Sequence, residues 1–424
     1  MKKMVCLVLL AGCFISSYAT DARVLTMGGN DNFFMDDVSI FRNPANINYY
    51  PNMLIGSLGI YNPTAADTAD TAKFGAMRLQ DKEPQKPYGG TILSYSLNQS
   101  SESGNQYPLL SFGVVINRWD PLLNYLDPSS NDFLKAFGPN KRDLVAPVGK
   151  IDVMVGYALQ NGAMIGVGTY LAFQKENRDH YNYESDIYKG DVGINWPIAK
   201  SMNLEVSFGI ASLMGKGKVF RQLTTTAPIV IDTVDETIAN NNLSFKGDIR
   251  LFSALTALNG DFVPHLSVER IGLNGFDATN YALGLGVNIN IDKGFFWTGI
   301  EGLVEEKDYS KVNSFVKDSL PTGIGGRLSA GIERNVVWDW LVLRIGVSKK
   351  LLYVSDGGEN GHWEQNPEAD GSDDDFAAVG VGVNIENRFR IDGVLAENIF
   401  YTWTALLSAP QHHLMNRISL TYSF

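Results

Sequence analysis

A short segment near the N-terminus combines residues that can build a rigid kink. Pro44 fixes its own φ angle and forces Asn43 out of the helical region. The Asn43 side chain can bond the backbone of its own turn and so cap it. Such a kink could hold a larger structure in place or touch a ligand, and it could also be a plain turn. The residues of this motif are Gly28, Gly29, Asp36, Asp37, Asn43, Pro44 and Ala45.

A second segment with binding potential, residues 119–147, spaces large apolar side chains among polar ones. The spacing predicts one or two short amphipathic helices. On an outer loop these side chains could form a docking groove for an apolar solute. Alternatively, they could pack the loop onto the rim of the fold. The side chains concerned are Trp119, Leu122, Leu123, Tyr125, Leu126, Phe133, Leu134 and Phe137.

Metal and enzyme chemistry find little support in the sequence. The acidic run 370–375 does not follow the spacing of an EF-hand, and the pair His412-His413 lacks further assignable ligands. We therefore expect both to be solvated, and we predict no metal site and no cofactor. The chain has no Gly-x-Ser-x-Gly elbow, phosphate loop, HExxH motif or dinucleotide fingerprint. We expect that the protein is not an enzyme.

The elements that position these motifs are predicted to be β-strands. The clearest case is the segment 281–291, where bulky apolar residues alternate with glycine, alanine and asparagine. Segments 151–159, 203–210 and 379–386 repeat the pattern. A face of glycines and polar residues cannot be the dry core of a soluble sandwich. The inverse arrangement, with apolar residues toward lipid and polar residues toward a lumen, predicts an all-β, transmembrane antiparallel outer-membrane β-barrel.

Composition agrees with a barrel. Of the 424 residues, 45% are hydrophobic and only 19% are charged, and 42 are glycine. No run of 18 or more apolar residues follows the N-terminus, so we predict no membrane-spanning helix. The formal net charge of −11 argues against a nucleic-acid partner. The partner implied instead is outer-membrane lipid.

Long and short connections alternate along the chain, which gives the predicted barrel a direction. Outer-membrane barrels have tight periplasmic turns and long outer loops. With Phe424 at the periplasmic rim, every long connection falls on the outer side. We count about 14–16 strands within a barrel of residues 51–424, and we expect residues 20–50 to form an N-terminal luminal plug. The long connections are 62–89, 119–147, 214–244, 305–324, 351–376 and 397–413, with shorter members at 175–185 and 272–279.

Charged residues also occur at positions predicted to face the lumen. They are expected to pair with one another or with the plug, and a role in solute selectivity is the alternative. These residues are Glu205, Glu301, Glu333 and Arg344.

The first residues read as an export signal. Lys2-Lys3 precede an apolar stretch at 5–15, and a small-x-small cleavage site lies at 17–19. We expect residues 1–19 to be a signal peptide that directs the protein to the outer membrane of a Gram-negative-type cell. The alternative is lipidation of Cys13, because the residues before it resemble a lipobox.

The motif of residues 27–45 resembles the N-terminal hatch of the FadL-type outer-membrane transporters of long-chain fatty acids and related hydrophobic compounds. Arg42 stands where that hatch usually has an aromatic residue, and Asn46 replaces a common glycine. The resemblance implies passive uptake of a hydrophobic small molecule through outer-loop docking, a lumen site and movement of the plug. The alternative is a structural or interaction barrel, such as a component of a type IX-like secretion system that binds protein partners through its outer loops. An apolar lumen region continuous with the 119–147 loop would favour transport, and a flat loop surface over a blocked lumen would favour the partner role.

Overall fold

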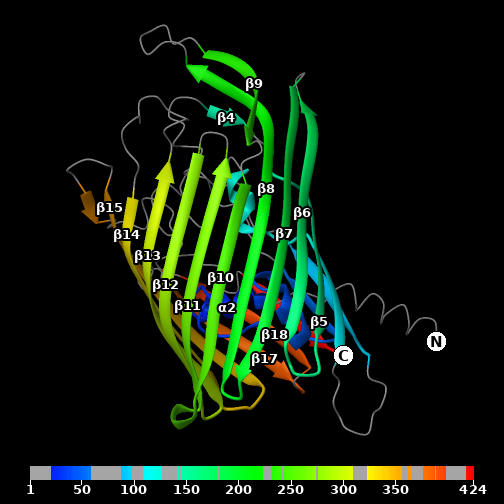
Figure 1. The fold of residues 1–424 in the computed structure, drawn as a ribbon, viewed down its shortest axis with the longest axis vertical. Coiled ribbons are helices and arrows are strands. Elements are labelled where there is room, and N and C mark those ends of the chain that lie inside the picture. Colours follow the sequence, from blue (N-terminus) through cyan, green and yellow to red (C-terminus); the bar gives the residue numbers. More distant parts are fainter. Residues whose placement is uncertain are drawn as a thin grey trace.

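The computed structural model of the chain is a tall barrel of tilted strands with short helices in the lower part of its interior (Figure 1). It describes residues 21–58, 87–97, 108–126, 141–143, 145–178, 181–222, 231–239, 243–273, 276–308, 322–355, 361–363, 376–386, 388–397 and 417–424. The predicted signal peptide, the acidic run at 370–375 and the pair His412-His413 lie outside these residues.

Sixteen of the described strands form the wall of the barrel. Every neighbouring pair in this wall is antiparallel, and β1 closes the ring because it pairs with β2 on one side and β19 on the other. The predicted barrel is confirmed, at the upper end of the predicted strand number. The wall strands are β1 Met53–Ser57, β2 Tyr88–Ser96, β3 Leu109–Ile116, β5 Gly149–Ala158, β6 Met164–Arg178, β7 Tyr181–Ala199, β8 Met202–Gln222, β10 Leu243–Leu255, β11 Gly260–Leu273, β12 Phe276–Ile291, β13 Gly294–Asp308, β14 Thr322–Asn335, β15 Leu341–Ser355, β17 Phe376–Ile385, β18 Phe389–Glu397 and β19 Ile418–Ser423.

Short elements complete the described fold. Three strands, β4 Lys141–Asp143, β9 Ile231–Ala239 and β16 Gly361–Trp363, pair with wall strands without belonging to the ring. The helical turns are α2 Asp21–Thr26, η1 Asp37–Phe41, η2 Pro44–Tyr49, η6 Pro121–Tyr125 and η7 Thr256–Leu258. Among the described residues, no helix is long and apolar enough to cross a membrane.

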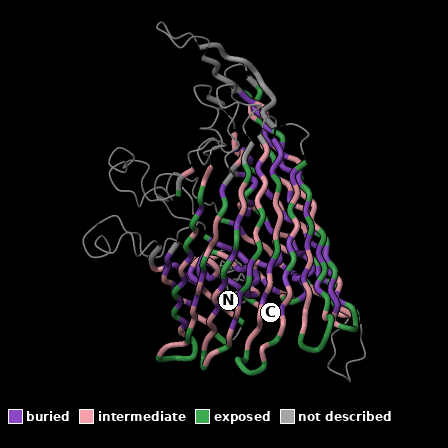
Figure 2. The backbone as a smooth tube through the Cα atoms, turned by 60° about the vertical axis from the view of Figure 1, so that its left-hand side comes forward, coloured by how far each residue is buried: buried purple, intermediate pink, exposed green. Residues whose placement is uncertain are grey.

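The two faces of each strand match the predicted inverse pattern. In β12, Leu283 and Leu285 are 65% and 51% exposed on the outside, whereas Asn288 points inward and is buried. The same alternation of exposed and buried positions runs along the other strands (Figure 2). A barrel with an apolar exterior and a polar interior is the architecture of outer-membrane proteins, because its closed ring leaves no unpaired strand edge in lipid.

Two of the predicted connections, 175–185 and 272–279, are shorter than predicted. Strands β6 and β7 stay paired up to Arg178 and Tyr181, and β11 and β12 up to Leu273 and Phe276. These strand ends carry many polar residues, among them the run 174–178, which is the composition of a loop. Where a strand extends beyond the lipid, water can reach both of its faces, and its backbone N–H and C=O groups still pair with the neighbouring strand.

Strands β7 and β8 are longer than is needed to cross a membrane. Strand β7 has 19 residues and β8 has 21, whereas about 9–11 residues cross a bilayer. The extra length projects beyond the end of the barrel opposite Phe424, and β9 and β4 pair with this projecting part of β8 (Figure 1). The tight connections at 159–163, 200–201 and 292–293 lie at the same end as Phe424, as predicted.

Candidate functional site

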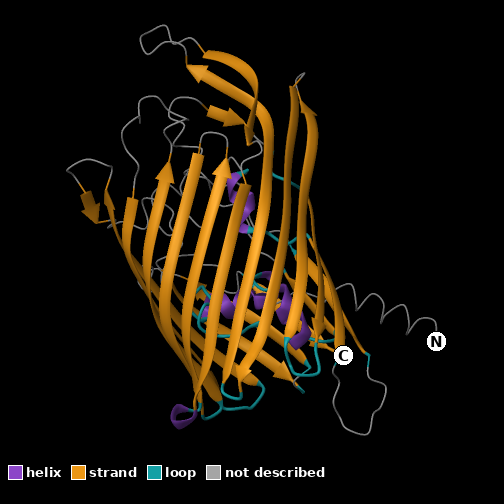
Figure 3. Ribbon diagram, viewed as in Figure 1, coloured by secondary structure: helices purple, strands orange, loops and turns teal. Residues whose placement is uncertain are grey.

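The N-terminal segment, residues 21–50, lies inside the barrel (Figure 3). Its helical turns contact several wall strands: η2 packs on β3, β5, β6 and β7, and α2 on β15, β17, β18 and β19. The segment therefore meets opposite sides of the lumen. The candidate site of this protein therefore lies in the lumen rather than on the outer surface.

The local structure of the segment follows from its motif residues. Gly28 and Gly29 have φ angles of 110° and 78°, which favour glycine. Asn43 is extended, and its Oδ1 accepts a hydrogen bond from the backbone N–H of Ala45 at 3.1 Å. Pro44 is the first residue of η2. Asn43 thus caps a turn that its neighbouring proline starts.

Asn43 also ties the kink to the wall. Its Nδ2 donates to the main-chain oxygen of Ile194 in β7 at 3.1 Å. Nearby, a Cβ atom at Gly166 of β6 would collide with the backbone of Pro44 and Ala45. The kink lies this close to the wall only because the wall position is glycine.

One ion-pair network joins α2 and η1 to strands β14, β15 and β18. Arg23 makes two hydrogen bonds to Glu333, at 2.9 and 2.6 Å, and one to Asp36 at 2.5 Å. Arg344 lies 2.9 Å from Glu333 and 2.7 Å from Asp392. Each buried charge has an opposite charge beside it, as burial in a low-dielectric lumen requires.

A second network contacts the middle of the segment. Arg250 of β10 is fully buried, pairs with Glu205 at 2.5 Å, and donates to the main-chain oxygens of Asp31 and Phe34. Asn195 bridges Glu205 and Asn46 of η2. Barrel side chains here recognise the backbone of the segment directly.

A third network surrounds Glu301 of β13. Its carboxylate accepts from Asn32 at 2.8 Å and from Arg327 at 2.7 Å, and it lies 3.0 Å from Nδ1 of His265. The other ring nitrogen of His265 lies 2.9 Å from Asp248. The four inward charges predicted from the sequence thus lie in three networks, and each network reaches residues 21–50.

Several residues of these networks were not singled out from the sequence, chiefly Arg23, Arg250, Asp248 and His265. Arg250 and Asp248 occupy alternate positions of β10, so the period of two that identified Glu205 also applied to them. Arg23 lies outside any strand, and only its contacts in the folded chain distinguish it.

Two adjacent carboxyl groups begin η1, Asp36 as its N-cap and Asp37 as its first residue, and their surroundings differ. Burial alone would raise the pKa of Asp36, but the Arg23 guanidinium and a hydrogen bond from Asp37 lower that pKa to about 2. Burial, followed by the neighbouring Asp36 charge, raises the pKa of Asp37 well above its usual range. Asp37 accepts a hydrogen bond from Thr421 of β19 at 3.1 Å. One carboxyl is therefore charged and the other holds its proton more firmly.

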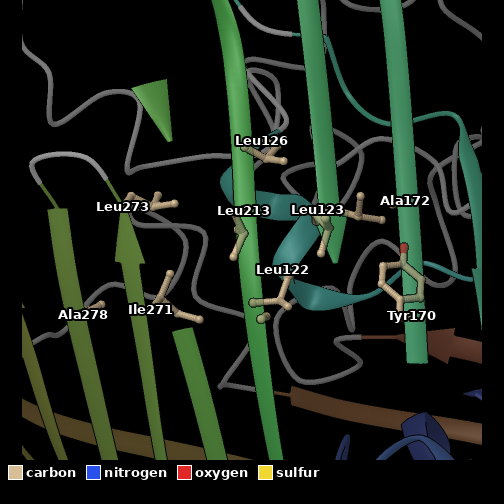
Figure 4. Close-up of a cluster of buried hydrophobic side chains, with 11 residues drawn as sticks. Leu122, Leu123, Leu126, Tyr170, Ala172, Leu213, Ile271, Leu273 and Ala278 are labelled. Atoms are coloured by element: carbon tan, nitrogen blue, oxygen red, sulfur yellow. The ribbon is translucent and has the colours of Figure 1, made fainter. Parts of the chain in front are cut away.

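An apolar cluster lies in the outer half of the lumen. Leu122, Leu123 and Leu126, on and next to η6, point inward and are buried (Figure 4). Trp119 and Tyr125 pack against the same group, whereas Phe133 and Phe137 lie outside the described residues. The wall side chains in this cluster, which we call the upper lumen cluster, are Tyr170, Ala172, Ile187, Ala211, Leu213, Ile271, Leu273 and Ala278.

A polar collar surrounds the base of η6. Arg118 pairs with Asp152 at 2.7 Å and with Asp120 at 3.1 Å, and Lys189 lies 3.4 Å from Asp120. Asp120 also caps η6 by accepting from the backbone N–H of Leu122. Burial would raise the pKa of Asp120, but Lys189 and Arg118 hold it below its usual range. The described start of the loop, residues 119–126, is thus anchored inside the barrel.

No metal centre appears in the described part of the chain, where no three His, Cys, Asp or Glu side chains are placed to share an ion. Apart from Asp37, the charged residues named above are paired with one another. What the lumen offers to a ligand is therefore an apolar upper region and a segment below it held by polar contacts.

Comparison with known proteins identifies only structural likeness. No protein-family model and no curated protein matches the chain. Among solved structures, the chain is similar to CdiB from Escherichia coli, with 10% identity, a TM-score of 0.38 and coverage of 88% of this chain and 63% of CdiB. It is similar to the CymD monoaromatic hydrocarbon channel, with 10% identity, a TM-score of 0.37 and coverage of 96% and 98%. It is also similar to the P. putida toluene transporter TodX, with 10% identity, a TM-score of 0.38 and coverage of 96% and 99%.

Proposed function

We propose that the protein is an outer-membrane channel that takes up hydrophobic, fatty-acid-like small molecules passively. The observation that carries this proposal is the upper lumen cluster, in which loop residues and wall residues form one apolar region inside the barrel. In a channel for sugars or ions, inward positions at this level would be polar, because water would have to wet them.

The energetics of the cluster favour an apolar solute. Exposing a buried leucine to water costs about 1.5–3 kcal/mol, so a water-filled passage past Leu122, Leu123 and Leu126 would be unfavourable. An apolar molecule that enters the cluster replaces contacts between side chains with contacts of the same kind. The upper lumen cluster would thus select an apolar solute through its lining.

The N-terminal segment would act as the plug of this channel. A solute would first dock among the apolar side chains of the 119–126 loop, and then enter the upper lumen cluster as η6 shifts. It would leave when the kink at Asn43-Pro44 moves away from the wall, which breaks the bond to Ile194. Transport down a concentration gradient needs no cofactor, and the outer-membrane lipid is the second partner.

The test is uptake by liposomes that contain the purified protein. We expect uptake of a long-chain fatty acid or an alkylbenzene, and exclusion of a sugar of similar size. Replacement of Asn43 and Pro44 by alanine should change the rate for the apolar solute. Equal flux of sugar and apolar solute, unaffected by these replacements, would show that the proposal is wrong.

A second candidate function, that of an interaction barrel, has one observation in its favour. The projecting parts of β7 and β8, with β9 paired to β8, form a sheet beyond the length needed to cross a bilayer. An exposed strand edge can pair with another protein. Shortening this projection at residues 217–239 separates the two candidates: apolar uptake should persist in a channel, whereas an interaction barrel should lose its crosslinked partner in intact cells.

A further inference from the structure

A cavity of about 550 Å³ lies at the end of the barrel that carries Phe424 and the short turns. Its lining comes from residues near the ends of six strands and from the N-terminal segment. Asn203 is the second residue of β8, Asp261 the second of β11, and Phe295 the second of β13. The cavity therefore opens toward the periplasm, below the N-terminal segment. Its volume is in the range of small-molecule sites.

Three phenyl rings from different elements line the cavity. Phe34 belongs to the N-terminal segment, Phe252 to β10 and Phe295 to β13. Phe34 packs on Phe295 with ring centroids 5.8 Å apart, and on Trp297 at 5.3 Å. Aromatic side chains on several sides provide stacking and edge contacts for a ring-bearing molecule.

The charged pair in the lining is already satisfied. The guanidinium of Arg23 donates twice to Glu333 and once to Asp36, and Glu333 also accepts from Arg344. Arg23 is therefore not available as a counter-ion for an acidic ligand. The amide of Asn288 is also used, because it donates to the main-chain oxygen of Phe33 and accepts from the backbone of Asp261.

Two further polar groups line the cavity. The Asp261 carboxylate shares a side-chain hydrogen bond with Asn288 but has no basic partner among the described residues. The Asn203 amide makes no side-chain hydrogen bond within the same part of the chain. Asn203 lies directly opposite Phe252 across the β8–β10 pair. A carboxylate has two oxygens and about four acceptor sites, so beside one hydrogen bond Asp261 can accept another, and without a cation beside it the carboxylate repels anions.

We infer that this cavity is a second binding site, which takes a neutral, ring-bearing molecule with a hydroxyl donor, such as a phenol. The ring packs on Phe34, Phe252 and Phe295, and the hydroxyl donates to Asp261. A carboxylate-bearing molecule is excluded, because Asp261 repels it and Arg23 is occupied. The inference rests on the proposed function in one respect, because the cavity would be the last site that a transported solute occupies before the periplasm. It narrows the proposed solute class from fatty-acid-like to phenol-like molecules.

Binding is tested with the purified full chain by equilibrium dialysis, with the same detergent on both sides of the membrane. The probes are 2-naphthol, naphthalene and 2-naphthoate. We expect 2-naphthol to bind more tightly than naphthalene, and 2-naphthoate to bind least. Loss of a hydrogen bond to a charged group in D261N should weaken 2-naphthol binding by about tenfold and leave naphthalene unchanged.

The matched control is D292N, because Asp292 lies on the neighbouring turn at the same rim with its side chain 84% exposed. It should bind all three probes like the original chain. F252A should weaken both 2-naphthol and naphthalene, which separates the ring contacts from the hydrogen bond. Absence of 2-naphthol binding, equal binding of 2-naphthol and 2-naphthoate, or an unaffected D261N would overturn the inference.

Parallel uptake of an alkylbenzene by liposomes keeps this result distinct from the proposed function. Uptake that persists while 2-naphthol binding is absent removes the second site and leaves the channel intact. Binding with the expected D261N effect in a protein that takes up no apolar solute supports the site and removes the channel.

Discussion

Arg23 and Glu333 form a two-point ion pair between residues 310 positions apart in the sequence. The Nε and Nη2 atoms of Arg23 donate to the two carboxylate oxygens of Glu333 at 2.9 and 2.6 Å. The pair joins the first helix of the N-terminal segment to strand β14 in a buried environment. It is the clearest single link between the segment and the wall.

Removing one member of this pair should loosen the segment strongly. E333Q leaves the Arg23 charge with less compensation, and breaking a buried pair costs about 3–5 kcal/mol. We expect a lower urea midpoint and faster proteolysis within residues 21–50. E184Q is the control, because Glu184 pairs with the exposed side chain of Lys175 at a distance of 3.9 Å. Equal behaviour of the two variants would mean that the Arg23–Glu333 pair does not hold the segment.

The glycine at position 166 should be needed for the kink to lie against the wall. G166A places a Cβ atom against the backbone of Pro44 and Ala45, and overpacking of this kind costs about 1–3 kcal/mol. G190A is the matched control on the adjacent strand, because nothing lies within 4 Å of a Cβ there. Urea unfolding of both variants measures the difference. A G166A protein as stable as G190A would contradict the described contact.

The cap at Asn43 should contribute measurably to stability. N43A removes the bonds to the Ala45 N–H and to the Ile194 carbonyl. Loss of a capping side chain costs about 0.5–2 kcal/mol. We expect a lowered urea midpoint and increased hydrogen exchange at residues 44–49. The prediction fails if exchange in η2 is unchanged.

Asp36 and Asp37 should respond to pH in opposite directions. The lowered pKa of Asp36 stabilises the folded protein at pH values above the unfolded pKa of about 4. This contribution is lost as the pH falls through the folded pKa of about 2. The raised pKa of Asp37 gives a contribution that is present below pH 4 and lost as pH rises through the folded value. Of these two carboxyls, only Asp37 contributes a slope between pH 4.5 and 7.5, and its contribution to stability falls over this window.

D37N isolates this effect, because an amide keeps the shape of the protonated carboxyl and does not titrate. Its urea midpoint should change less between pH 4.5 and 7.5 than that of the original chain, and it should be higher at pH 7.5. D36N should be destabilised at both pH values, since it leaves Arg23 without one partner. An identical pH slope in the original chain and D37N would refute the assignment.

The barrel could be predicted from the sequence because its signal is local. Leu283, Leu285 and their neighbours alternate with a period of two, and the period alone assigns the faces. The sorted lengths of the connections gave the orientation for the same reason. The extent of β6 and β7 was underestimated, since Lys175 and Glu184 are polar residues in a strand that has already left the lipid.

The arrangement inside the lumen could be predicted only in part. Glu205, Glu301 and Glu333 were expected to face inward, but their partners Arg250, His265 and Arg23 depend on which strands become neighbours and where the N-terminal segment lies. The position of η6 is a similar case. The apolar character of Leu122 and Leu123 could be seen in the sequence, whereas their burial within the barrel depends on wall residues as far away as Ile271 and Leu273.

The most direct test of the proposed channel changes the lining of the upper lumen cluster. L123N and L213N each place an amide in this cluster, and L283N places one on the outer face of β12 as a control for handling and insertion. Alkylbenzene and sugar uptake are measured in the same liposomes. We expect the rate of alkylbenzene uptake to fall at least tenfold in L123N and in L213N and to stay unchanged in L283N. Unchanged alkylbenzene uptake in both cluster variants would contradict transport through the lumen.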